Sequence, residues 1–252
     1  EEETDSMEIS LLTDVGQKRT NNQDYANLFV NRAGKTLIIL ADGMGGHRAG
    51  NIASEMAVTD LGAAWVDTQI DSVNQVREWF AEHLEEENQR IHQFGQDEEY
   101  KGMGTTLEAL AIIDNQAIYA HIGDSRIGLI RGDEYRQLTN DHSPVNALLK
   151  AGQITPEEAE RHPQKNIITQ SIGQKDEVQP DYGMITLEDG DYLLLNSDGL
   201  TNMISDSEIC DIVTSDISLS EKTETLIRFA NNAGGLDNIT VALVRFDKED
   251  KA

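Results

Sequence analysis

The segment TLIILADGMGGHRAG, residues 36–50, joins an aliphatic run to an acidic residue and then to a stretch with little side-chain bulk. Residues 36–41 have the length and composition of a buried β-strand, and Asp42 follows directly. Five of the next eight residues are glycine or alanine. Because small residues let other groups come close to the backbone, the end of this strand is a candidate functional site.

Other apolar runs of strand length lie on both sides of this segment, at residues 9–12, 25–30, 107–113, 117–122, 127–131, 192–196 and 239–246. Tight turns at Asp114-Asn115 and at residues 131–134 join neighbouring runs, which favours antiparallel pairing.

Helical periodicity covers residues 51–66 and 72–94, and later residues 205–213 and 221–232. Ser205 and Glu208 have the spacing of a capping box at the start of the third of these helices. Blocks of strands interrupted by pairs of helices predict an α+β fold, with helices packed outside mostly antiparallel sheets.

A chain of 252 residues is long enough for one large domain. Residues 143–173 depart from the surrounding pattern, because prolines and glycines separate short, polar, weakly helical pieces, and they predict a mobile flap. Residues 1–6 are read as an added polar stub before a natural start at Met7. The predicted domain is therefore 7–248, with its flap at about 143–173.

Composition restricts the classes of partner. The net charge of −26 repels polyphosphate backbones and anionic membranes, which argues against nucleic-acid and membrane binding. No apolar run approaches the roughly 20 residues that span a bilayer. Cys210 is the single cysteine and no secretion signal is visible, so we expect a cytoplasmic location. The acidity itself has two readings, solubility alone or carboxylates that hold cations.

Four aspartates lie at the ends of apolar strands: Asp42, Asp124, Asp198 and Asp237. Each alone is an ordinary turn residue. Because apolar strands converge in one core, the four together would face one another, and such crowding of like charges is costly unless a cation compensates. Oxygen ligands favour Mg²⁺ or Mn²⁺ over zinc, so we predict a site for these ions with the Gly43 carbonyl as a further ligand.

Two such ions, roughly 3.5–4 Å apart, activate a shared water and neutralise oxyanions, as phosphate-ester hydrolysis requires. Arg19 could grip two phosphate oxygens through its planar guanidinium. His47, five residues after Asp42, could protonate the leaving alkoxide. Cys210 lacks an arginine shortly after it, and residues 40–43 lack an Asp-x-Asp pair, which argues against covalent thiol and aspartyl routes.

Short motifs run through nearly the whole chain, from about Ile9 to Phe246. They are Arg19-x-x-Asn22-x-Asp24, Asp42-Gly43-Met44-Gly45-Gly46-His47, Gly104-Thr105-Thr106, Gly123-Asp124-Ser125-Arg126, Thr139-x-Asp141-His142, Ser197-Asp198-Gly199 and Asp237-Asn238-Ile239-Thr240. In this order they resemble the metal-dependent PPM (PP2C-type) serine/threonine protein phosphatases, in the compact form common in bacteria.

The resemblance implies a four-layer α-β-β-α sandwich with metals at one edge of two central sheets. Asp42 would bridge two catalytic ions, Mn²⁺ or Mg²⁺. The Gly43 carbonyl would complete one ion, and Asp198 and Asp237 would hold the other. Asp124 with Asp198 would hold a third, weaker ion.

The resemblance also implies roles around the metals. Arg19 would bind the phosphate, and His47 would act as general acid. Asp24 and Asn238 would support the metal ligands from behind. Gln23 is a departure, because many relatives carry glutamate there and a neutral amide contacts metal-bound water less strongly.

The function this implies is hydrolysis of phosphoserine and phosphothreonine on proteins by direct attack of a water activated by two metal ions. The chain would act as a monomer on phosphorylated proteins and oppose a cytosolic serine/threonine kinase. Two alternatives stay open. A catalytically silent phosphatase-like domain that binds partners should have lost ligands, whereas Asp42, Asp198 and Asp237 are present. A hydrolase of small phosphoesters would prefer sugar phosphates to a phosphopeptide.

Overall fold

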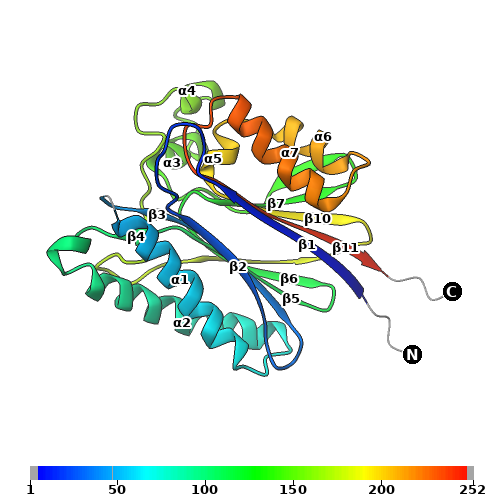
Figure 1. The fold of residues 1–252 in the computed structure, drawn as a ribbon, viewed down its shortest axis with the longest axis horizontal. Helices are drawn as coiled ribbons and strands as arrows, with labels where there is room; N and C mark the ends of the chain where they lie inside the picture. Colours follow the sequence, from blue (N-terminus) through cyan, green and yellow to red (C-terminus); the bar gives the residue numbers. More distant parts are fainter. Residues whose placement is uncertain (1–4, 47, 249–252) are drawn as a thin grey trace.

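Two antiparallel β-sheets form the centre of the structure, and helices cover the outer face of each sheet (Figure 1). The structure is a computed structural model that describes residues 5–46 and 48–248. The four layers confirm the predicted α-β-β-α sandwich.

The first sheet has six strands, in the order β2-β3-β5-β6-β9 with β4 paired to β3. Their bounds are β2 Asp24–Val30, β3 Thr36–Met44, β4 Gly104–Thr105, β5 Leu107–Ile113, β6 Gln116–Ile122 and β9 Asp181–Thr186. The second sheet has five strands, in the order β1-β11-β10-β7-β8. Their bounds are β1 Asp5–Asp14, β7 Arg126–Arg131, β8 Glu134–Gln137, β10 Asp191–Asn196 and β11 Ile239–Lys248.

Two long helices cover the first sheet and two shorter ones cover the second (Figure 1). Their bounds are α1 Ala49–Val66, α2 Val73–Phe94, α6 Asp206–Thr214 and α7 Leu219–Asn232. A 3₁₀ turn, Glu98–Tyr100, follows α2, and the short α5, Asp198–Thr201, follows β10. Ser205 and Glu208 form the predicted capping box at α6, which satisfies backbone N–H groups at its first turn.

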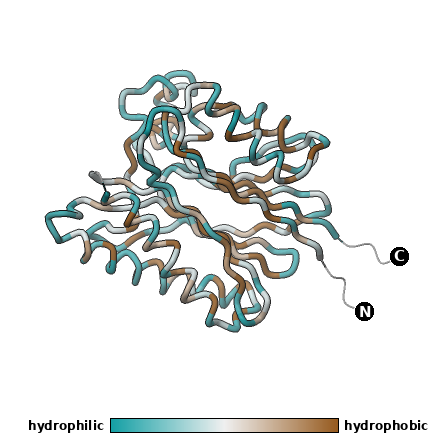
Figure 2. The backbone as a smooth tube through the Cα atoms, in the orientation of Figure 1, coloured by the Kyte–Doolittle hydropathy of each residue, from teal (hydrophilic) through white to brown (hydrophobic). Residues whose placement is uncertain are grey.

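Three apolar layers separate the four layers of secondary structure, and strands appear brown along much of their length in Figure 2. In β3, Leu37 and Ile39 pack toward α1 and α2, whereas Ile38 and Leu40 pack between the sheets. The solid apolar run is therefore a strand buried on both faces. The same alternation places Asp42 on the face between the sheets, at the strand's end.

The predicted flap contains two short helices, α3 Pro144–Lys150 and α4 Pro156–Glu160. They lie at the end of the sandwich opposite the two chain termini (Figure 1). Thr105 and Ile172 exchange two backbone hydrogen bonds of 3.0 and 2.8 Å, which fasten the end of the flap to β4. The extent of the domain and the origin of residues 1–6 stay predictions, although Ser6 is part of β1.

The structure adds three strands that the sequence analysis did not predict. β4 has two residues, and β8 is short and polar. β9 is an edge strand, and most of its residues are exposed. Among the described residues, no helix combines the length and apolar character needed to cross a membrane.

Candidate metal centre

The acidic cluster forms where strands of the two sheets end beside each other. Asp24 lies directly opposite Asp42 in the antiparallel β2–β3 pair. Asp124 follows β6, Asp198 follows β10 as the first residue of α5, and Asp237 lies two residues before β11. The strand-end aspartates predicted from the sequence are therefore brought to one end of the sandwich.

The carboxyl groups of this cluster influence one another's ionisation. The pKa of Asp42 is raised well above its ordinary value, first by burial and then by the charges of Asp24, Asp198, Asp124 and Asp237. Interaction with the Asp42 side chain lowers the pKa of Asp198 and opposes part of the effect of burial. Burial and mutual repulsion therefore favour the neutral form of these carboxyl groups in the absence of a cation.

The carboxyl groups at the edge of the cluster are shifted in the same direction. Burial, followed by the charge of Asp237, raises the pKa of Asp198 to about 6. Burial and the charges of Asp198 and Asp141 raise the pKa of Asp124 to about 7. Asp42, Asp124, Asp198 and Asp237 all keep part of their surface open to solvent, so a ligand from solution can reach them.

Asp24 is the buried member of the group, with 6% of its surface exposed. Its Oδ2 accepts hydrogen bonds from Ser197 Oγ at 2.7 Å and from Thr240 Oγ1 at 2.6 Å. Burial raises the pKa of Asp24 to about 7, although the two hydroxyl donors oppose this shift. Asp24 therefore forms hydrogen bonds with residues of the opposite sheet and its connection to α5, and it does not face solvent.

Asn238 connects the start of β11 to the loop that carries Arg19. Its Oδ1 accepts from the Gln23 backbone N–H at 2.8 Å, and its Nδ2 donates to the carbonyls of Val15 and Asn21, each at 2.9 Å. Asn238 is 4% exposed. It therefore holds the loop against the cluster, next to Asp237.

Gly43 lies where β3 meets the first turn of α1. A Cβ atom placed on Gly43 would lie 1.9 Å from the Gly50 carbonyl oxygen. The Gly43 N–H donates to the Gln23 carbonyl at 2.9 Å. Close approach of strand and helix is thus a direct reason for glycine here, beside the access for ions that the sequence suggested. The Gln23 amide donates only a long bond, 3.4 Å, to the Gly45 carbonyl.

Arg19 lies at the open side of the cluster. Its Nη2 contacts Asp237 Oδ2 at 2.9 Å, with both side chains substantially exposed. An exposed pair of this kind contributes little to stability, so the guanidinium can exchange partners at small cost. His47, the predicted general acid, lies outside the described residues.

The donor set fits hard divalent cations. Four partly exposed carboxyl groups, those of Asp42, Asp124, Asp198 and Asp237, lie at one end of the sandwich, where crowding of like charges is costly. Oxygen donors of this kind are those that Mg²⁺ and Mn²⁺ prefer. Cys210, by contrast, is 8% exposed and packs in the apolar layer under α6 and α7, away from this chemistry.

The sequence analysis missed a second polar cluster beside Asp124. His121 Nδ1 lies 2.6 Å from Glu108 Oε1, with both side chains fully buried. His142 Nε2 lies 3.1 Å from Asp181 Oδ2. One signal was available, because Glu108 interrupts an otherwise apolar strand.

The chain is similar to known proteins over nearly its whole length. Residues 15–242 match the family model described as protein phosphatase 2C. The chain is 84% identical over 244 residues to protein phosphatase PhpP of Streptococcus pneumoniae, which covers 97% of this chain and 99% of that protein.

Two solved structures extend the comparison. The S. agalactiae serine/threonine phosphatase has a TM-score of 0.94 and 60% identity, and the match covers 97% of this chain and all of that one. The catalytic domain of the serine/threonine protein phosphatase PstP, in complex with two manganese ions, has a TM-score of 0.82 and 31% identity. That match covers 97% of this chain and 100% of the PstP chain.

Proposed function

The chain belongs to the protein phosphatase 2C family and is a metal-dependent serine/threonine protein phosphatase, and we propose that its acidic cluster is the catalytic centre. The observation that carries this proposal is the convergence of Asp42, Asp198 and Asp237 from strands of both sheets on one end of the sandwich, where their charges interact. A cation stabilises the carboxylate form of an acid in this position, so metal binding would displace the proton of the neutral carboxyl group.

We assign the metal ligands by combining family membership with the positions of the residues. Asp42 would be a ligand of both ions. The Gly43 carbonyl would be a ligand of one ion, and Asp198 and Asp237 would be ligands of the other. Asp124, beside Asp198, would contribute to a third and weaker site. Bound Mn²⁺ or Mg²⁺ would activate a water as nucleophile and neutralise charge on the phosphoryl group.

The chain's own side chains would orient the substrate and deliver a proton. The Arg19 side chain is exposed, and we propose that it turns from Asp237 to two phosphate oxygens. His47 would protonate the leaving serine or threonine oxygen. Asp24 and Asn238 would keep the ligand-bearing strands and the Arg19 loop in register through their buried hydrogen bonds.

The partners follow from this chemistry. The substrates are phosphorylated proteins, and the functional counterpart would be a serine/threonine protein kinase. We further propose a monomer that acts in the cytoplasm, with a single domain over 7–248 and its flap at about 143–173. The flap starts directly after His142, whose N–H donates to the carbonyl of Gly123 beside Asp124, and it would contact a bound phosphoprotein there.

Phosphate release from a phosphothreonine peptide tests the proposal. We expect turnover in Mn²⁺ or Mg²⁺, loss of turnover in excess chelator, and at least about a hundredfold loss of kcat in Asp42→Asn and Asp198→Asn. Full activity in chelator, or in either variant, would contradict the assignment. A strong preference for sugar phosphates over the peptide would contradict the substrate class.

A further inference from the structure

The two residues that precede the flap, Asp141 and His142, hold both sides of Asp124. The His142 N–H donates to the Gly123 carbonyl at 2.8 Å, and the Gly123 N–H donates to His142 Nδ1 at 3.2 Å. On the other side, Arg126 donates two hydrogen bonds to the Asp141 carboxylate, at 3.0 and 2.7 Å. Asp124 therefore lies on a turn that is clamped before and after it.

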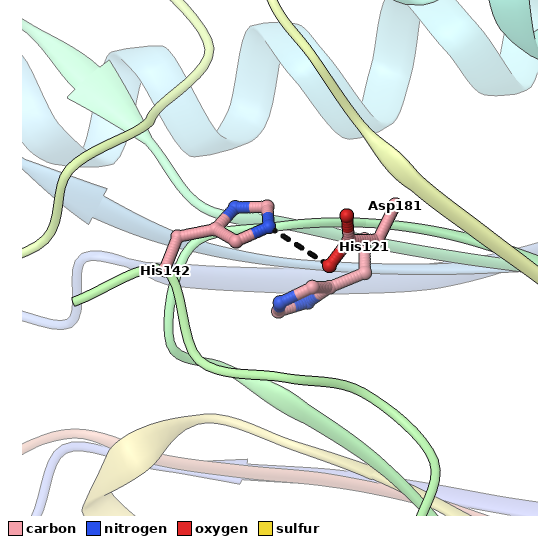
Figure 3. A group of neighbouring side chains, drawn as sticks. All are labelled: His121, His142 and Asp181. Carbon is pink, nitrogen blue, oxygen red and sulfur yellow. Dashed lines mark hydrogen bonds and ion pairs between the residues drawn. The ribbon is translucent and has the colours of Figure 1, made fainter. Parts of the chain in front are cut away.

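His142 is itself fixed by the flap and by β9. Its carbonyl accepts from the Thr169 N–H at 2.8 Å, near the end of the flap. Asn146, in the first turn of α3, donates through Nδ2 to the Asp141 carbonyl at 2.8 Å. Figure 3 shows the His142 ring turned toward the Asp181 carboxylate, which it contacts at 3.1 Å.

The hydrogen bonds determine the protonation of the His142 ring. Because Nδ1 accepts a backbone N–H, the ring proton must lie on Nε2, from which it is donated to Asp181. The His121 ring lies 4.6 Å away, centroid to centroid. Burial disfavours charge on His121, but Glu108 outweighs burial and raises the pKa of His121 to about 9. Burial and the charge of His121 lower the pKa of His142, which keeps Nδ1 free to accept.

A metal site is the competing reading of this cluster, because ligand atoms of His121, His142 and Asp181 lie within 4.8 Å of one another. Each ring nitrogen, however, already has a hydrogen-bond partner: Glu108 and the Asn140 carbonyl for His121, and Gly123 and Asp181 for His142. A cation on His142 Nε2 would require either an imidazolate or loss of the Gly123 bond. The geometry favours a positioning role.

We propose that His142 is a positioning residue for Asp124, acting through the lone pair on Nδ1 that receives the Gly123 N–H. This inference rests on the proposed function, since it assigns a task to Asp124 in the same reaction. It differs from a general contribution to folding because only one of the two ring nitrogens performs it.

Two isosteric variants separate the nitrogens. The amide oxygen of His142→Asn lies close to the position of Nδ1 and can accept from Gly123, whereas His142→Gln places its amide near Nε2 and can reach only Asp181. Asp181→Asn is the matched control for the outer contact. Gly123 amide hydrogen exchange in metal-free protein reports the bond directly, and kcat on a phosphothreonine peptide reports its consequence.

We expect His142→Gln to speed Gly123 amide exchange and to lower kcat at least about tenfold, the usual scale for residues that support metal ligands. His142→Asn and Asp181→Asn should stay within about threefold of the parent in kcat. Added to Asp124→Ala, His142→Gln should cause no further loss, because both changes remove the same contribution.

Equal activity of His142→Gln and the parent would overturn the proposal, as would equal losses in the Gln and Asn variants or multiplied losses in the double variant. Failure of His142→Gln alone to fold would show a structural role and also overturn it. If the parent itself releases no phosphate, the proposed function fails, while Gly123 exchange still decides whether Nδ1 holds the turn.

Discussion

Asp24 illustrates, at the scale of single residues, how an acid is accommodated between two sheets. Two hydroxyl groups from the opposite sheet and its connection to α5 donate to one of its oxygens. Thr240 Oγ1 also shares a hydrogen bond of 2.7 Å with Thr13 Oγ1. The pair Thr240 and Asp24 thus links β11 to β2, and loss of the donor leaves a buried carboxyl group without part of its compensation.

Replacement of Thr240 by valine tests this link. We expect Thr240→Val to lower the free energy of unfolding by about 1–3 kcal/mol, because the shape is kept and a buried hydrogen-bond donor is lost. Urea denaturation in chelator measures the change. Thr186→Val, at an exposed position of β9, is the control and should alter stability by less than about 0.5 kcal/mol. Equal effects of the two substitutions would contradict the role given to Thr240.

Contacts between residues that are far apart in the sequence limit what the sequence alone can predict. Glu108 and His121 are thirteen positions apart, and only the register of β5 and β6 shows that they face each other. The Arg19 contact with Asp237 joins opposite ends of the chain. Asp42, Asp198 and Asp237 were predicted as a site because each follows or precedes an apolar strand, a local signal that needs no knowledge of pairing.

At the scale of elements, the junction of β3 and α1 is a close backbone contact beside the acidic cluster. Gly43 and Gly50 pack backbone against backbone, and Ser54 Oγ donates to the Gln23 carbonyl at 2.6 Å. The helix is therefore seated directly on the strand that carries Asp42. A side chain at Gly43 would force α1 away from this strand.

We expect Gly43→Ala to reduce the free energy of unfolding by at least about 2 kcal/mol, because its Cβ meets rigid backbone rather than a movable side chain. Gly46→Ala is the control, since a Cβ there meets nothing within 4 Å, and it should change stability by less than about 1 kcal/mol. Thermal or urea unfolding distinguishes them. A Gly43→Ala protein as stable as the parent would show that the junction relaxes freely.

The sequence predicts a strand reliably when the strand is buried, because burial requires a run of apolar residues. Both faces of β3 are buried, so its apolar run was plain in the sequence. β9 was missed because it is an edge strand, with Tyr182 and Met184 exposed and Gly183 between them. Its position comes from pairing with β6, a tertiary contact that overrides weak local preference.

At the scale of the whole molecule, buried and crowded carboxylates destabilise the folded protein when no metal is bound. Several acids have folded pKa values far above the ordinary range near 4, including Asp24 and Asp124 at about 7 and Asp198 at about 6. Between about pH 4 and pH 7 the folded state therefore binds more protons than the unfolded state. The contribution of these groups to the free energy of unfolding is present at low pH. It is lost as the pH rises through their pKa values in the folded state.

In chelator, we accordingly expect the Tm at pH 5.5 to exceed the Tm at pH 8 by at least about 3 °C. Mn²⁺ should reduce or reverse this difference, because ions take the place of the protons at high pH. Differential scanning calorimetry at constant ionic strength measures both arms. A Tm in chelator that rises from pH 5.5 to pH 8 would contradict the account of the cluster.

Diffraction from crystals soaked in Mn²⁺, recorded at the manganese absorption edge, tests the central claim most directly. We predict two strong anomalous peaks in contact with the Asp42 carboxylate, one also touching Asp198 and Asp237, and a weaker peak beside Asp124. Peaks elsewhere on the surface, with none at Asp42, would contradict the assignment of the acidic cluster as the catalytic metal centre.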